Sequence, residues 1–194
     1  MSATYQAPKN GFRTFLIVWL TQSISVFGSA LTMFAINIWM VTTLYPNPEQ
    51  KAQLAGALAA VNLAFTIPAL SIAMFAGAWA DRHDRKMTMF WWDIVSFVLS
   101  LVLAILLGTH RLQLWMLLIG AVVNALAATF HGSAFDTAYA MLVPDHQLPR
   151  ANGMMQTMWA LSGVLSPGLA AFLIALPALA RQHFAASWFG SLLG

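Results

Sequence analysis

Apolar and polar positions along the chain fall into long uncharged blocks joined by short polar links. Asp93 is the one charged residue in the third of five such blocks, and the other four contain no Lys, Arg, Asp or Glu. A helix needs about 20 apolar residues to cross a bilayer, and every block is long enough. The pattern therefore predicts five complete membrane helices, near residues 14–43, 52–79, 87–109, 112–135 and 151–177.

A further apolar segment, residues 183–194, is too short to cross a bilayer. We expect it to be a truncated sixth helix. The links are brief and rich in turn residues, which leaves no room for a soluble domain. The first block is longer than the apolar part of a signal peptide and is expected to stay as an anchor. The predicted fold class is thus all-α, a polytopic membrane helix bundle in which residues 1–194 form a single transmembrane domain.

Composition supports this class and excludes several kinds of chemistry. Apolar residues make up 60% of the chain and charged residues only 8%, whereas soluble domains carry roughly 25% charged residues. The absence of cysteine excludes disulfides and thiol catalysis. The five histidines are dispersed, and no phosphate-binding loop or serine nucleophile elbow is present. We therefore expect no metal, no cofactor and no enzymatic activity, and the small net charge of +3 gives no indication of nucleic-acid binding.

The basic residues are distributed unevenly between the two sides of the predicted bundle. With a cytoplasmic N-terminus, three of the nine lie outside (Lys51, Arg111, Arg181) and six lie inside (Lys9, Arg13, Arg82, Arg85, Lys86, Arg150). Cytoplasmic links carry an excess of Lys and Arg. The distribution therefore predicts a cytoplasmic N-terminus.

The link between the second and third helices is the most highly charged stretch, with five charges in the six residues 81–86. A basic link is commonly only a topology anchor, but acids contribute little to orientation, so Asp81 and Asp84 favour a further role. Asp81 continues a stripe of small residues that includes Ala73 and Gly77, a spacing that allows two helices to approach closely. We expect Asp81 to face a neighbouring helix and to act as a latch, either on a helix N-terminus or on an arginine.

This link resembles the signature of the major facilitator superfamily, Gly-x-x-x-Asp-Arg-x-Gly-Arg-Lys. The matching positions are Gly77, Asp81, Arg82, Arg85 and Lys86, and Asp84 stands at the glycine position. The stretches "WLTQSISVFGSALTMFAINIW" and "LVPDHQLPRANGMMQTMWALSGVLSPGLAAFL" are similar to the branch that exports macrolides and siderophores. The resemblance covers residues 12–176.

The resemblance implies a transporter built from two six-helix halves, of which this chain would be the N-terminal half, ending within helix six. In that family the signature acid docks on a helix of the other half. We expect either that this chain is a fragment of a longer protein that contains the C-terminal half, or that a second copy of the chain takes the place of that half.

Polar residues at mid-helix depth are candidates for the wall of a substrate cavity, because polar groups facing lipid are costly. Hydrogen bonding between helices is the alternative role for them. Helix four lacks the arginine that many similar proton-coupled exporters carry, and an asparagine occupies that region. The cavity candidates are Gln22, Ser25, Asn37, Asn62 and Asn124.

Two acids are assigned to the latch together with the signature residues. Asp93 lies inside the third helix and could pair with Arg82 or Arg85, or carry a proton. Asp136 is expected just beyond the cytoplasmic end of helix four. In helix five, Ser166 and Pro167 resemble the antiporter pattern, and a bend is expected there because proline breaks the backbone hydrogen-bond ladder.

The combined interpretation is a secondary active transporter in a bacterial inner membrane, which exports a small amphipathic drug, macrolide or siderophore. Protons would drive it, and its partners would be the lipid bilayer, the small-molecule substrate and the other half. The alternative is a membrane scaffold or small assembly subunit that transports nothing.

Overall fold

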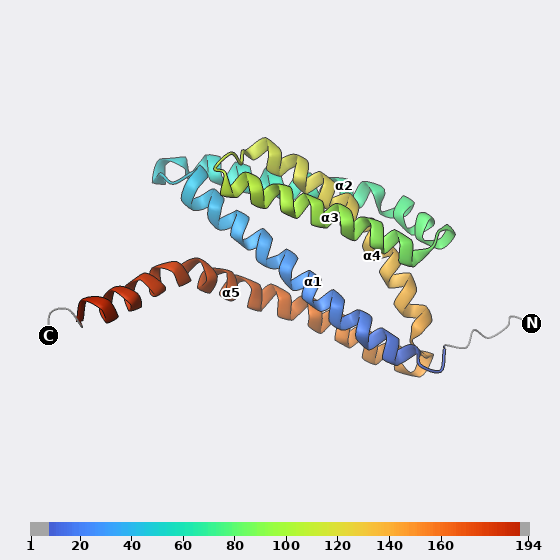
Figure 1. The fold of residues 1–194 in the computed structure, drawn as a ribbon. Helices are drawn as coiled ribbons and strands as arrows, with labels where there is room; N and C mark the ends of the chain where they lie inside the picture. Colours follow the sequence, from blue (N-terminus) through green and yellow to red (C-terminus); the bar gives the residue numbers. More distant parts are fainter. Residues whose placement is uncertain (1–7, 191–194) are drawn as a thin grey trace, which may run out of the picture. The chain divides into compact units, whose positions relative to one another are not determined.

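The computed structural model describes residues 8–190, except for the side chains of residues 174, 175 and 177–190, and over that range it is helical with short turns and no strand (Figure 1). The helices are α1 (Gly11–Trp39), α2 (Lys51–Arg82), α3 (Arg85–Gly108), α4 (Leu114–Leu142) and α5 (Leu148–Gly190). A π-helical turn, Met40–Leu44, extends α1, and 3-10 turns, Pro48–Gln50 and Asp145–Gln147, precede α2 and α5. The all-α fold class is therefore confirmed.

Four segments within the described residues are long and apolar enough to cross a membrane: Gly11–Leu44, Pro48–Arg82, Arg85–Gly108 and Leu114–Leu142. They coincide with the first four predicted helices. Large apolar side chains such as Leu70, Met74 and Val164 lie exposed on the helices, as expected where lipid replaces water as the solvent. The chain is thus a multi-pass membrane protein.

Local sequence chemistry fixes two of the helix starts. Before α2, Asn47 and Gln50 form a reciprocal capping box, in which the Asn47 N–H donates to Gln50 Oε1 over 3.2 Å. At α3, the Asp84 carboxylate accepts a hydrogen bond of 2.9 Å from the backbone N–H of Met87. Side-chain oxygens at these positions satisfy backbone donors that the helix itself leaves unpaired.

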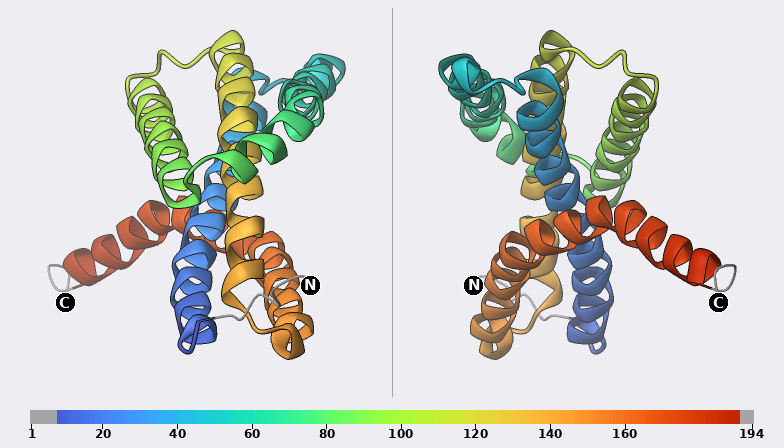
Figure 2. Two further views of the ribbon diagram at one scale, coloured as in Figure 1. Left: turned by 90° about the vertical axis from the view of Figure 1, so that its right-hand side faces the viewer. Right: turned by 90° about the vertical axis from the view of Figure 1, so that its left-hand side faces the viewer.

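The chain divides into two compact units. The first unit contains α2, α3, α4 and the first turn of α1, and within it α4 packs against both α2 and α3 (Figure 2). The buried face of α2 consists of Ala57, Val61, Ala76 and Ala80. On α4, a Cβ added at Gly120 would lie 3.6 Å from side-chain carbons of Leu99 and Leu103 on α3. Small residues therefore let the helices of this unit approach closely.

The first turn of α1 belongs to this unit because it packs on the end of α4. Phe15 is fully buried, and its ring centroid lies 6.0 Å from that of Tyr139. A Cβ added at Gly11 would overlap the carbonyl oxygen of Leu142. Glycine is therefore the residue that this close approach requires.

The second unit contains the rest of α1 and α5. The indole Nε1 of Trp19 donates to the carbonyl of Met154 over 3.0 Å, and the hydroxyl of Ser166 donates to the carbonyl of Phe27 over 3.3 Å. The buried residues of α5 recur every three or four positions: Ala151, Met155, Met158, Ser162, Ser166 and Ala170. The buried face of α5 thus includes the small residues Ser162, Ser166 and Ala170, which allow close packing.

Two predicted boundaries differ from the structure. Helix four continues past residue 135 to Leu142, because Tyr139 extends the aromatic row of Phe135 and Phe15 and keeps the last turns packed. Asp136 consequently lies inside α4 and not beyond its end.

The gap expected between residues 177 and 183 is also absent, since α5 runs uninterrupted to Gly190. Proline at 177 removes one backbone donor, which membrane helices tolerate, and the alanines and leucines around it favour helix. A separate sixth segment is therefore not confirmed, and residues 191–194 lie outside the described residues. Figure 1 shows that α5 bends along its length, but the bend assigned to Ser166 and Pro167 remains a prediction.

Candidate functional site

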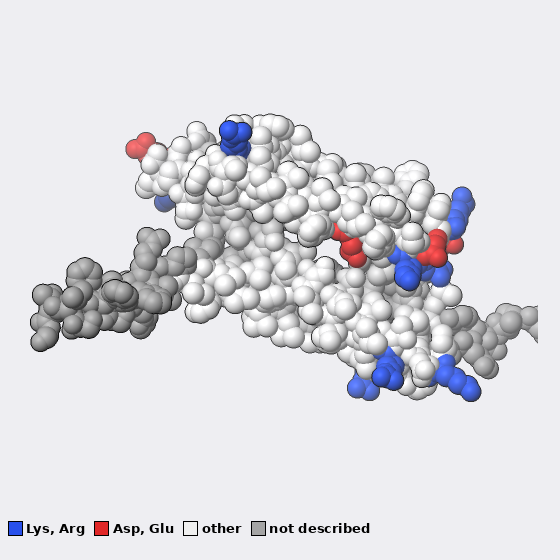
Figure 3. Space-filling view, in the orientation of Figure 1, with Lys and Arg blue, Asp and Glu red and all other residues white. Residues whose placement is uncertain are grey.

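The turn between α2 and α3 is short and held by local contacts. The ring of His83 stacks on Trp79 at 3.7 Å, with an interplanar angle of 7°. Asp84 then caps α3, as described above. Figure 3 shows acidic and basic side chains gathered where α2 and α3 meet. The charged link of the sequence is thus a rigid two-helix corner, in which the carboxylate of Asp84 has a structural role that the sequence analysis did not assign.

Asp81 is not covered by a helix in the described part of the chain. Its side chain is exposed at the end of α2, and so is that of Ala73, two stripe positions earlier. The buried stripe of α2 contains Ala76 and Ala80, one position before Gly77 and Asp81. Because α4 packs on the adjacent face of α2, no helix among the described residues covers Asp81. The docking of Asp81 on a neighbouring helix therefore remains a prediction.

The basic residues of the corner behave differently from one another. Arg82 and Lys86 are exposed. Arg85 is half-buried, and its Nη1 lies 2.7 Å from the sulfur of Met141 on α4. Its Nε is buried and has no hydrogen-bond partner among the described residues. A guanidinium donor in this environment is incompletely satisfied, which is costly for a charged group.

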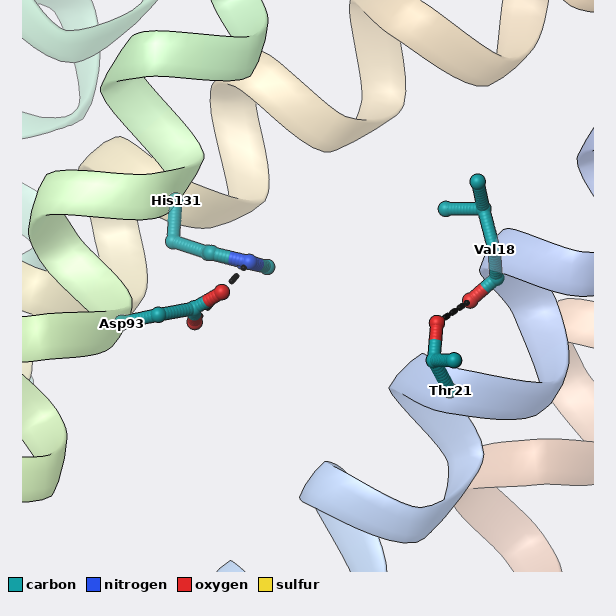
Figure 4. Close-up of polar contacts among 4 residues, drawn as sticks. All are labelled: Val18, Thr21, Asp93 and His131. Carbon is teal, nitrogen blue, oxygen red and sulfur yellow. Dashed lines mark hydrogen bonds and ion pairs between the residues drawn. The ribbon is translucent and has the colours of Figure 1, made fainter.

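Asp93 pairs with a histidine and not with an arginine. Its Oδ1 lies 3.3 Å from Nε2 of His131, and the contact joins α3 to α4 (Figure 4). The expected pairing with Arg82 or Arg85 is therefore wrong. Asp93 lies eight residues, or about 12 Å, along the helix from Arg85, and α4 presents His131 at its level.

Aromatic residues next to this pair connect α2, α3 and α4. The rings of Trp92 and Phe130 stack at 4.9 Å with an interplanar angle of 11°, and Trp79 meets Phe130 edge-on at 6.1 Å. Trp92 precedes Asp93, and Phe130 precedes His131. Since stacked aromatic pairs prefer defined geometries, this cluster holds the pair in register.

Sequence reasoning missed His131, although a signal was present. Of the five histidines, it is the one that falls well inside a predicted helix of the first four, just as Asp93 is the one acid inside the third. Asp93 and Asp136, the two acids added to the latch, both interact with His131. Asp93 forms the ion pair, and the charge of Asp136 on α4 interacts with that of His131. Asp136 itself is exposed.

The five cavity candidates are divided between the two units. Gln22, Ser25 and Asn37 lie on α1 in the second unit. In the first unit, the amide of Asn62 donates back to the carbonyl of Leu58 over 2.8 Å, and Asn124 is half-buried on α4. The hydrogen bond of Asn62 thus lies within α2 and does not join two helices. Both roles considered for the five residues, a shared cavity wall and hydrogen bonding between helices, remain predictions.

Comparisons with known proteins agree with the motif and the membrane helices. The family model described as Major Facilitator Superfamily matches residues 18–189. The chain is similar to a macrolide efflux protein A of Streptococcus pyogenes, with 28% identity over 82% of this chain and 37% of that protein. A macrolide efflux protein A of Enterococcus faecalis is 33% identical over 50% of this chain and 30% of that protein. The chain thus spans well under half the length of these relatives, and no solved structure matches it.

Proposed function

Because the chain belongs to the major facilitator superfamily, we propose that it takes part in the export of small amphipathic molecules of the macrolide type, driven by protons that move inward. The observation that carries export is the similarity to proteins named for macrolide efflux in two bacterial species. The same similarity supports a bacterial inner membrane as the location. Transport in this fold is a rocking of two halves about a site near the membrane midplane.

The charged corner supports the role of a conformational latch. Asp81 is exposed at the end of α2, and a Cβ added at Gly77 would meet nothing within 4 Å. This face is open to a further helix, supplied either by a C-terminal half or by a second copy. The docked carboxylate would accept hydrogen bonds from that helix N-terminus, while Arg82, Arg85 and Lys86 keep the corner at the cytoplasmic surface.

The test compares the chain with matched variants in a bacterial host that lacks its own drug efflux pumps. Cells are loaded with radiolabelled erythromycin, and its retention is measured with and without a protonophore. We expect lower retention in cells that express the chain, and we expect the protonophore to abolish the difference. Equal retention in cells with and without a stably inserted chain would overturn the proposal. The alternative, a membrane scaffold that transports nothing, would then be favoured.

Crosslinking in the same membranes identifies what completes the bundle. The chain has no cysteine, so a single cysteine at Ala73, on the exposed stripe of α2, labels one face without further changes. A specific crosslinked dimer would identify a second copy as the other half. A cysteine at exposed Trp115, at the start of α4, serves as the control because it lies away from this corner.

A further inference from the structure

Asp93 and His131 form an ionisable pair between two membrane-spanning helices. Their contact of 3.3 Å joins α3 to α4, and both helices are long and apolar enough to cross a bilayer. The imidazole is mostly covered, with 16% of its side chain exposed, while the carboxylate is 54% exposed. Ionisable groups at such positions are expensive, so their presence indicates a function.

The pair is neutral overall only when it holds a proton on the imidazole. In that state an imidazolium lies against a carboxylate, and the two charges compensate each other. When the proton leaves Nε2, the carboxylate keeps its negative charge within the span, next to a neutral imidazole whose Nε2 no longer donates to it. Because an uncompensated charge in an apolar medium is costly, the strength of the α3–α4 contact depends on the proton.

The surroundings hold the two groups in place and leave the proton a route. The imidazole stacks on Phe135 at 6.3 Å, and Trp92 stacks on Phe130 beside it. The side chain of Asp93 is 54% exposed, and a proton would enter or leave on that side. Packing therefore positions Nε2 of His131, and a proton would reach this atom by way of the Asp93 carboxylate.

Other charged or titratable groups lie on each element of the first unit. On α4 these are Asp136, which interacts with His131, and Tyr139, which interacts with Asp136. The start of α3 carries Arg85 and Lys86, and the end of α2 carries Asp81, Arg82 and His83, with His83 stacked on Trp79. The first turn of α1 carries Arg13. Among the described residues, Asp93 forms its ion pair with His131.

We propose that Asp93 and His131 together form the binding site for the coupling proton, with the proton on His131 Nε2 and the carboxylate of Asp93 as its counter-ion. This inference rests on the proton-driven export proposed above. Binding of the proton to His131 strengthens the contact between α3 and α4, and its release weakens that contact. Proton movement is thereby linked to the packing of α3 on α4. No bond other than that of the proton forms or breaks.

The first test needs no transport. Since the chain lacks cysteine, spin labels can be placed at the exposed positions Ser100 on α3 and Ala128 on α4 in lipid nanodiscs. We expect the label separation to increase and its distribution to broaden from about pH 5 to pH 8, the range in which histidine changes charge. His131→Gln retains a neutral donor at the position of Nε2 and should remove this pH response. A response that is unchanged in His131→Gln, or absent in the unsubstituted chain, would overturn the proposal.

The second test separates this inference from the proposed function. In everted vesicles, uptake of radiolabelled erythromycin is measured with a proton gradient, and exchange of erythromycin is measured without one. We expect Asp93→Asn, His131→Gln and the double variant each to lose at least about 10-fold of gradient-driven uptake and to retain exchange. Equal losses in the single and double variants indicate one shared site.

Exposed His110, between α3 and α4, provides the matched control His110→Gln, which should leave gradient-driven uptake unchanged. If the unsubstituted chain takes up no erythromycin, the proposed function fails, and the spin-label test still decides the proton site. If the unsubstituted chain responds to the gradient and His131→Gln responds equally, the proton site fails alone.

Discussion

Replacing Gly11 by alanine should loosen the first turn of α1 from the end of α4. The added Cβ would overlap the carbonyl oxygen of Leu142, which is backbone and held at the end of a helix. Alanine in a helix is otherwise favoured over glycine by about 1 kcal/mol, so that gain has to be subtracted. The contact cannot be relieved by a side-chain rotation, and one of the two helix ends has to move.

The magnitude follows from what such a movement disturbs. Overpacking a close contact costs about 1–3 kcal/mol, and the same turn carries Phe15, which is fully buried against Tyr139. Separation of these rings would forfeit an aromatic contact of about 0.5–1.5 kcal/mol. With the helix-propensity gain subtracted, we expect Gly11→Ala to lower the free energy of unfolding by about 0.5–3.5 kcal/mol.

Unfolding of the purified chain in mixed micelles, followed by the fluorescence of its eight tryptophans, measures this loss. Gly132→Ala on α4 is the matched control, since its Cβ would meet nothing within 4 Å, and it should be neutral or slightly stabilising. Equal stability of Gly11→Ala and Gly132→Ala would refute the argument, because the two glycines differ in the proximity of the Leu142 carbonyl.

Substitutions at three further positions test other parts of the structure. Asp84→Ala removes the cap on the Met87 N–H and should cost about 1 kcal/mol in micelle unfolding, whereas Asp84→Asn keeps an acceptor and should cost far less; equal losses would contradict capping. Ser166→Ala removes the hydrogen bond to Phe27 but keeps the small size, so the loss should be about 0.6 kcal/mol, and Ser166→Leu should lose more through overpacking. Asp81→Asn should abolish erythromycin export in cells without changing the amount of inserted protein, and normal export by this variant would exclude the latch.

The helices could be predicted from the sequence because their signals are local. A bilayer requires long apolar blocks, and charged residues between blocks mark the turns, so the first four helices were found with modest errors at their ends. Helix four was placed too short because its last turns contain the polar residues Asp136 and Thr137. Those turns are helical because Tyr139 packs beside Phe15, a contact between distant parts of the chain.

The candidate site could be predicted only in part, for the same reason. Asp93 was recognised from the cost of an acid inside a span, but its partner could not be read from spacing. His131 meets Asp93 because α3 and α4 run in opposite directions from a short link, which sets their relative register. Arginine is the usual expectation beside a carboxylate, and here Arg85 contacts the sulfur of Met141 instead.

The contacts of α1 have a consequence for how the chain is made. Trp19 hydrogen-bonds to a carbonyl 135 residues further along, and Phe15 packs on a ring of α4. At a translation rate of about 5–20 residues per second, Trp19 is synthesised roughly 7–27 s before Met154. During that interval lipid, or the insertion machinery, has to cover the surface that later binds α5. Helix α1 is therefore made well before α5, the helix on which it packs.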